Sequence, residues 1–272
     1  MYTQPIDRHH PGCIVFLVDQ SGSMTDMMGG GTSSKSEVLA QAVNRLITNL
    51  VLQCQRGEEI RDYYHLGLIG YGKTTGPAWG GSLLGQHLVP ISVVADHELR
   101  MVSEALPGDP LVRIEQPVWL EPRADGGTPM TAAINMAGAM VVEWANAHPD
   151  SFPPVIVNIS DGEATDGDPR TLAAQLRGIH TDDGELLLFN VNLSSEPMAA
   201  IEYPNSPQSL PDNYARSLFE MSSNLSPYMV AVARGMGLQV ADGARGFVFN
   251  ADPARLSEFL DVGTRISRVS DR

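Results

Sequence analysis

An unbroken apolar run at residues 14–18 ends on Asp19 and constrains the fold more than any other stretch of the chain. Such a run is typical of a β-strand that is buried on both faces, as in the mainly parallel sheets of α/β proteins. The loop beyond Asp19 carries two alternating hydroxyls, Ser21 and Ser23. Ligands of open α/β sheets bind at the carboxyl ends of the strands, and small oxygen ligands suit a hard divalent cation. The sequence therefore predicts an α/β fold with a candidate cation site after its first strand.

Two later stretches place further oxygen-bearing side chains in loops. Residues 126–130 read Gly-Gly-Thr-Pro-Met and carry the hydroxyl of Thr128. Residues 155–160 form a second apolar strand pattern, and Asp161 follows it directly. In this order, the three motifs resemble the metal-ion-dependent adhesion site of von Willebrand factor A (VWA) domains, whose first loop has the pattern Asp-x-Ser-x-Ser.

The resemblance implies a role for each of these residues. Ser21, Ser23 and Thr128 would bind the cation directly through their hydroxyl oxygens, and Asp19 and Asp161 would hold metal-bound waters. Mg2+ is the expected ion, with Mn2+ or Ca2+ as alternatives. Neutral hydroxyl ligands would leave the ion electron-poor, and the resemblance implies that one coordination position stays open. We therefore expect a protein partner to present a Glu or Asp carboxylate there. The competing interpretation is that the three hydroxyl residues only cap helices or turns, where Ser and Thr are favoured.

Strand and helix patterns alternate along the rest of the chain, which predicts a mainly parallel sheet with helices on both faces. The resemblance adds a doubly wound, six-stranded sheet in the order 3-2-1-4-5-6 with one antiparallel edge strand. We expect a single VWA-like domain over residues 1–272, with an N-terminal arm at 1–11 and a long insertion with short helices at 194–239 before the last strand. Further strands are expected at 64–72, 88–94 (the antiparallel edge), 186–192 and 246–250, and helices from about 37 to 50 and at 131–147, 169–180 and 253–264.

The final helix, at 253–264, raises the question of movement. In VWA domains, partner binding at the metal can be coupled to a shift of this helix. The insertion at 194–239 carries five prolines and many apolar side chains. We expect it to brace the helix, which would make the module a constitutive binder and not a switch.

Charge and composition exclude several classes of partner. The formal charge of −14 argues against nucleic acid and anionic membranes, which are bound chiefly through Lys and Arg. No apolar stretch approaches the ~20 residues of a membrane-spanning helix, and the first residues lack the basic and apolar regions of a signal peptide. Cys13 and Cys54 are isolated and lack metal-binding spacing. We therefore expect a cytoplasmic protein that binds neither nucleic acid nor membrane.

Other motifs give little support to catalysis. Residues 29–36 nearly match a phosphate-binding P-loop, but Ser34 stands where a Gly should precede the Lys. The chain has no HExxH zinc motif and no GxSxG nucleophile motif. Glu163 would add a carboxylate to the same cluster, but we expect it to cap a loop. Asp166 and Asp168 would be ligands for a second cation, but we expect a solvated turn and a helix N-cap.

These observations favour a non-enzymatic, metal-dependent protein-interaction module in a bacterial cytoplasmic signalling or stress-response system. The Ser-Asp-Gly sequence at 160–162 resembles bacterial cytoplasmic members, in particular the tellurite-resistance-associated VWA family. Genes of that family often neighbour a PPM-type phosphatase and a protein kinase, so a kinase/phosphatase pair is an expected partner. An AAA+ ATPase is the alternative partner. The alternatives are a metal-dependent phosphoester hydrolase, in which the ion activates a water, and an accessory subunit of an AAA+ ATPase. In a further interpretation, the ion only stabilises the three loops.

Overall fold

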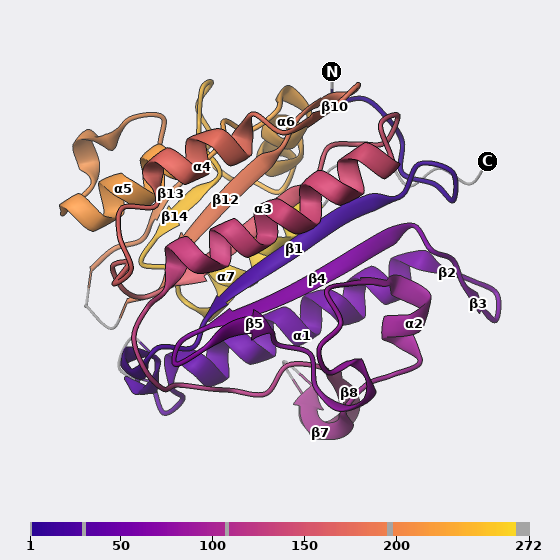
Figure 1. The fold of residues 1–272 in the computed structure, drawn as a ribbon. Coiled ribbons are helices and arrows are strands. Elements are labelled where there is room, and N and C mark those ends of the chain that lie inside the picture. Colours follow the sequence, from indigo (N-terminus) through magenta and orange to yellow (C-terminus); the bar gives the residue numbers. More distant parts are fainter. Residues whose placement is uncertain (1, 29–30, 107–108, 195–197, 265–272) are drawn as a thin grey trace.

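A mainly parallel sheet runs through the centre of the molecule (Figure 1). The computed structural model describes residues 2–28, 31–106, 109–194 and 198–264, and within these ranges the sheet has eight strands. They lie in the order β13-β14-β12-β9-β1-β4-β5, and β6 also pairs with β4. The parallel strands are β14 (Phe247–Phe249), β12 (Leu187–Asn192), β9 (Val155–Ser160), β1 (Gly12–Asp19) and β4 (Tyr64–Tyr71). The antiparallel strands are β5 (Thr75–Pro77), β6 (Leu88–Pro90) and β13 (Ile201–Glu202).

The central strand β1 is buried along its whole length. Because successive side chains of a strand point to opposite faces, Phe16 packs into one core and Val15 into the other. Val18 lies opposite Ile159 of β9, so the two strands end at the same level. The loops that follow β1 and β9 therefore leave the sheet side by side.

Helices cover both faces of the sheet and give three layers (Figure 1). The helices of one face share a buried core: α1 (Lys35–Cys54), α6 (Pro227–Gly235) and α7 (Pro253–Thr264). Those of the other face are α3 (Met130–Ala147), α4 (Arg170–Arg177) and α5 (Asn213–Met221). Among the described residues, no helix combines the length and apolar character needed to cross a bilayer.

Local sequence explains where the helices begin and which face they bury. α1 begins with a capping box, in which Ser34 Oγ accepts a hydrogen bond from the Glu37 N–H and Glu37 Oε2 accepts one from the Ser34 N–H at 2.8 Å. In α3, buried residues recur every three or four positions, among them Ile134, Val141 and Trp144. Each helix therefore presents one apolar face to the sheet.

Short elements complete the described part of the chain. The single-turn helices are η1 (Gly22–Thr25), η2 (Gly81–Leu83), η3 (Pro207–Ser209) and α2 (Ile91–Ala95). The hairpins outside the sheet are β2–β3 (Gln55–Arg56, Glu59–Ile60), β7–β8 (Arg100–Leu106, Asp109–Val118) and β10–β11 (His180–Thr181, Gly184–Glu185).

The sheet differs from the sequence prediction in its edges. The sequence predicts six strands and one antiparallel edge strand, whereas the described residues form eight strands with antiparallel pairing at both edges. The prediction of a strand at 88–94 is wrong beyond Pro90, because residues 91–95 form α2. Ile91 and Val94 are three residues apart and both buried, as on one face of a helix, and Pro90 has no N–H to extend a ladder.

The described part of the segment 194–239 packs on both faces of the sheet. It supplies α5 to one face and α6 to the other. α6 lies against α7, and Leu225 and Met229 share a core with Leu256 and Phe259 of α7. The segment therefore contributes side chains to the core that holds the final helix.

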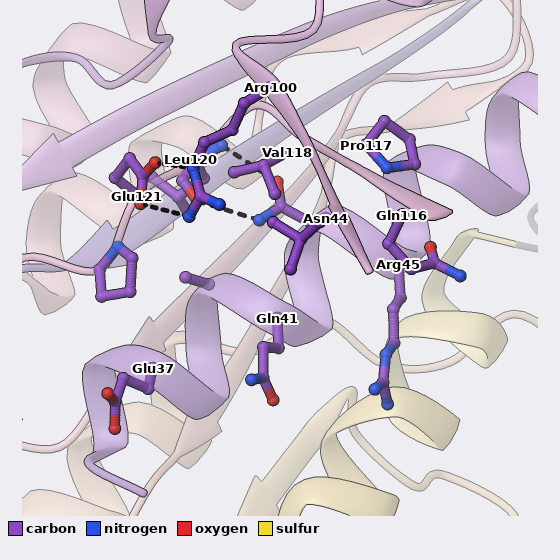
Figure 2. A pocket seen from close by; sticks show the side chains of 13 residues that line it. Glu37, Gln41, Asn44, Arg45, Arg100, Gln116, Pro117, Val118, Leu120 and Glu121 are labelled. Atoms are coloured by element: carbon purple, nitrogen blue, oxygen red, sulfur yellow. Dashed lines mark hydrogen bonds and ion pairs between the residues drawn. The ribbon is translucent and has the colours of Figure 1, made fainter. Parts of the chain in front are cut away.

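The β7–β8 hairpin stands outside the sheet and contacts α1 (Figure 1). Asn44 of α1 is buried, and its Oδ1 accepts hydrogen bonds from the N–H groups of Trp119 (2.9 Å) and Leu120 (3.0 Å). Its Nδ2 donates to the carbonyl of Leu120 at 2.9 Å. A cavity of about 190 Å3 lies between these elements, and the ion pair of Arg100 and Glu121 (Nε–Oε1 2.7 Å) lines it. Figure 2 shows the side chains around this cavity. Asn44 therefore ties the base of the hairpin to α1.

We expect the substitution Asn44→Ala to lower the free energy of unfolding by about 3 kcal/mol, because two N–H groups and one carbonyl lose their buried partner. Urea denaturation measures the change. Gln41→Ala, at an exposed position of the same helix, is the control and should change the free energy of unfolding by less than about 0.5 kcal/mol. Equal effects of the two substitutions would contradict this role of Asn44.

Candidate metal centre

Three loops meet at the carboxyl edge of the sheet: the loops after β1, before α3 and after β9. From β1 the chain continues to β4 on one side, whereas β9, β12 and β14 follow one another on the other side. The loops therefore lie at the point where the direction of winding reverses, which is where ligands bind in open α/β sheets.

The five predicted site residues come together at this edge. The hydroxyl oxygens of Ser21 and Ser23 are 3.1 Å apart, and Ser23 Oγ donates to Asp161 Oδ1 at 2.8 Å. The backbone N–H of Ser21 donates to Asp19 Oδ1 at 2.8 Å. Thr128 Oγ1 and Ser23 Oγ lie 3.5 Å and 3.9 Å from where a Cβ on Gly162 would be, so both hydroxyls face this glycine. The set thus joins three loops that are far apart in sequence.

Asp19 is buried and held by hydrogen bonds on both carboxylate oxygens. Besides the Ser21 N–H on Oδ1, Ser160 Oγ donates to its Oδ2 at 2.6 Å, and the hydroxyl of Tyr214 donates to Ser160 Oγ at 3.1 Å. Burial, with a smaller contribution from the nearby charge of Asp161, raises the pKa of Asp19 to about 6, against the lowering effect of the hydrogen bonds from Ser160 and Ser21. The described protein groups therefore compensate this buried charge only in part.

The side chain of Asp161 is fully buried and carries a buried ion pair. Its Oδ2 accepts a hydrogen bond from Lys35 Nζ at 2.8 Å, and the Lys35 side chain is only 6% exposed. Lys35 is the first residue of α1, and its Nζ also lies 3.5 Å from Oδ2 of the more exposed Asp26. The site thus contains one cation that belongs to the protein itself.

Backbone contacts hold the second loop against the other two. Gly126 has a φ of +85°, and a Cβ there would lie 2.5 Å from the Cα of Lys73, so only glycine fits. Its carbonyl accepts a hydrogen bond from the Gly22 N–H of the first loop at 3.0 Å. Thr128 exchanges two bonds with Thr165 of the third loop, through its N–H to Thr165 Oγ1 (3.0 Å) and through its carbonyl to the Thr165 N–H (2.9 Å).

The capping interpretation does not describe these hydroxyls. Ser21 precedes η1, but its side chain makes no capping hydrogen bond. The residue that caps α3 is Pro129 and not Thr128. Ser23 lies within η1 and directs its hydroxyl to Asp161. Their side chains therefore face the site.

Two acidic residues of the third loop, Asp166 and Asp168, have partners outside the site. Asp166 accepts hydrogen bonds from the N–H groups of Thr131 (3.0 Å) and Ala132 (2.8 Å) at the start of α3. Asp168 pairs with Arg170 at 2.7 Å, which lowers the pKa of the carboxyl to about 2, and Glu163 is exposed. No group of three His, Cys, Asp or Glu side chains that could hold a metal occurs within the part of the chain that the structure describes.

The chemistry of the donors fits a hard divalent cation. Two carboxylates and three hydroxyls offer oxygen atoms only, which suits Mg2+, Mn2+ or Ca2+ and not a soft metal. A hydroxyl that donates its proton to a carboxylate, as Ser23 does to Asp161, keeps lone pairs for a cation. The raised pKa of Asp19 is a second sign that positive charge would be favourable here.

Sequence reasoning missed Lys35, Ser160, Tyr214 and Thr165. Lys35 lies in the run that nearly matches a P-loop. The one feature that could have pointed to it is its positive charge in the first turn of a helix, where the helix dipole disfavours a cation. Ser160 was visible as a hydroxyl at the end of the second apolar strand. Tyr214 and Thr165 gave no signal, because only the tertiary fold brings them to the site.

Comparison with known proteins adds evidence on the fold. No protein-family model and no curated protein matches the chain. Among solved structures, the pilus adhesin SpaC from Lactobacillus rhamnosus GG matches with a TM-score of 0.50 and 12% identity, covering 95% of this chain and 30% of SpaC. At this identity the likeness shows a shared fold and nothing about ligands.

Two further solved structures match more weakly. The vWF domain of the type V pili tip protein Mfa5 from Porphyromonas gingivalis is 15% identical with a TM-score of 0.34, and the match covers 57% of this chain and 39% of that one. Manganese-loaded TRAP protein from Plasmodium vivax is 13% identical with a TM-score of 0.42 and coverages of 93% and 72%. The chain thus spans well under half of the SpaC and Mfa5 chains that it matches.

We expect Ser160→Ala to lower the free energy of unfolding by about 2 kcal/mol, because a buried carboxylate loses a charge-assisted hydrogen bond. Tyr214→Phe removes a bond between neutral groups and should cost about 1 kcal/mol. Urea denaturation in the presence of a chelator compares the two substitutions. A larger loss for Tyr214→Phe would show that Ser160 does not support Asp19.

Proposed function

We propose that this chain is a VWA-type, metal-dependent protein-interaction module that binds Mg2+ at Asp19, Ser21, Ser23, Thr128 and Asp161. The observation that carries the proposal is the convergence of these side chains from three loops at the winding reversal of the sheet. Mn2+ and Ca2+ are the alternative ions, because they also prefer oxygen ligands.

In this proposal each residue acts through the atom that it already directs to the site. Ser21, Ser23 and Thr128 bind the cation through hydroxyl oxygens, while Asp19 and Asp161 hold waters and supply negative charge. The bound cation supplies a strong electrostatic attraction for an anionic oxygen. A Glu or Asp carboxylate of a partner protein is the ligand that fits, and the metal becomes part of the interface.

We propose that the module is not an enzyme. Both oxygens of Asp19 accept hydrogen bonds from the protein, as do both oxygens of Asp161. Neither carboxylate is therefore placed as a free general base, which would need to reach the proton of a substrate.

For the cellular setting, we propose a bacterial cytoplasmic signalling or stress-response system, such as one of the tellurite-resistance-associated type. The partner would be a kinase/phosphatase pair or an AAA+ ATPase that presents an acidic side chain. The formal charge of −14 supports a partner other than nucleic acid or an anionic membrane. Cys13 and Cys54 are both free and buried, which agrees with a reducing compartment.

Titration calorimetry of Mg2+ and Mn2+ into chelator-treated protein tests the proposed site. We expect Asp19→Ala and Ser21→Ala each to weaken binding by on the order of tenfold to a hundredfold, because each removes an oxygen group that holds the cation or its waters. Asp168→Ala is the matched control, since this carboxylate lies in the third loop but pairs with Arg170. Undiminished binding in both site variants would refute the assignment.

Hydrogen exchange tests whether the module is a constitutive binder. We expect Mn2+ and an acidic peptide to change protection in the three loops and to leave α7 unchanged, because α6 packs against α7 and shares its core. Asp19→Ala protein treated in the same way is the control for nonspecific effects. New protection or exposure across α7 would contradict the bracing role.

A further inference from the structure

The Lys35–Asp161 pair is the feature of the site that its proposed function does not require. Its two side chains come from α1 and from the loop after β9, 126 residues apart in sequence. Lys35 Nζ lies 2.8 Å from Asp161 Oδ2, with the lysine side chain 6% exposed and the aspartate side chain fully buried. Burying a lysine ammonium has a large desolvation cost. A charged lysine is therefore found in such a place only if its charge is paired.

Local structure offers no reason for a lysine at this position. Lys35 follows the N-cap Ser34, so its charge lies at the positive end of the α1 dipole. The capping box formed by Ser34 and Glu37 already satisfies the helix start without it. Of its two carboxylate partners among the described residues, Asp26 is exposed and lies at 3.5 Å, whereas Asp161 is buried and lies at 2.8 Å, so the main partner of the ammonium is Asp161.

The charges of the site change sign when a divalent cation binds. Counting the buried groups alone, Asp19 and Asp161 together with Lys35 leave one net negative charge before binding, and a divalent cation converts this to one net positive charge. Asp26 is left out of this count because its side chain is 59% exposed and its charge is screened by water. Without the lysine, two carboxylates would neutralise a divalent cation fully. Lys35 therefore repels the incoming metal ion. It also leaves the metal-bound site with an excess positive charge, which an anionic ligand would neutralise.

We propose that Lys35 is a built-in counter-cation that makes metal binding at this site depend on an anionic ligand. The role presupposes the proposed metal site and adds a coupling to it. Metal alone binds weakly, because its charge is opposed by the ammonium. A carboxylate at the open position offsets the excess positive charge, so metal and carboxylate each tighten the binding of the other.

The test is calorimetric titration of Mn2+ into wild-type protein with acetate absent and then saturating, at constant ionic strength. We expect acetate to tighten Mn2+ binding by on the order of tenfold in the wild type. In Lys35→Gln, which keeps a donor for Asp161 but removes the charge, Mn2+ alone should bind on the order of tenfold more tightly and the effect of acetate should largely disappear.

Two control variants separate charge from other effects. Lys35→Arg keeps the charge and should behave as the wild type. Lys73→Met removes an exposed lysine that lies 3.5 Å from Asp125 beside the second loop, and should also behave as the wild type. Thermal unfolding in chelator establishes that each variant is folded.

The outcomes distinguish this role from the proposed function. Wild-type binding of Mn2+ that does not respond to acetate would overturn the role of Lys35, and this measurement needs no variant. Equal Mn2+ affinity of wild type and Lys35→Gln would also overturn it. Failure of every protein to bind Mn2+, with or without acetate, would refute the metal site itself and the coupling with it. Binding by Lys35→Gln where wild type binds only with acetate would support both.

Discussion

The buried carboxylate of Asp19 is the constraint on which the rest of the site depends. It ends the central strand, and burial raises its pKa to about 6, so the surrounding chain must supply hydrogen-bond donors. One donor is the Ser21 N–H, which reaches Asp19 because the first loop turns back directly after β1. The other is the Ser160 hydroxyl, at the end of the neighbouring strand. The same two bonds thus orient the carboxylate and join the ends of β1 and β9.

The centre of the fold was predictable from sequence, and its edges only in part: the antiparallel strand β6 was predicted, with too late an end. β1 and β9 are buried on both faces, so their residues are mostly apolar, and Asn158 is the one polar residue in the interior of β9. Such runs can be recognised without knowledge of their neighbours. β5 and β13 have three and two residues, too few to show a period, and each exists because a longer strand offers it a partner. The β7–β8 hairpin was missed for a related reason, since it packs on α1 through Asn44 and lies outside the sheet.

Some residues of the site could be predicted from a local sequence pattern, whereas others are brought there only by tertiary contacts. Asp19, Ser21 and Ser23 lie within five residues, so their spacing alone indicates a common function. Lys35 and Ser160 act on Asp161 and Asp19 across 126 and 141 residues, and no spacing in the chain encodes such a contact. A motif can therefore name the oxygen atoms of a site, while the groups that set its charge and orientation appear only in the fold.

Buried polar groups differ in charge between the interior of the sheet and its carboxyl edge. Inside the sheet the buried polar groups are neutral and paired: Tyr71 donates to Asn158 at 2.7 Å, and Asn158 donates to Asn190 at 3.0 Å. At the carboxyl edge, the chain instead buries two carboxylates and an ammonium, although charged groups seldom stabilise a fold as well as apolar or neutral ones. Sequences break this rule chiefly where function requires it. An external ion can offset the cost of these charges, and because a ligand of the folded state adds its binding free energy to folding, occupancy of this edge and stability of the loops are linked.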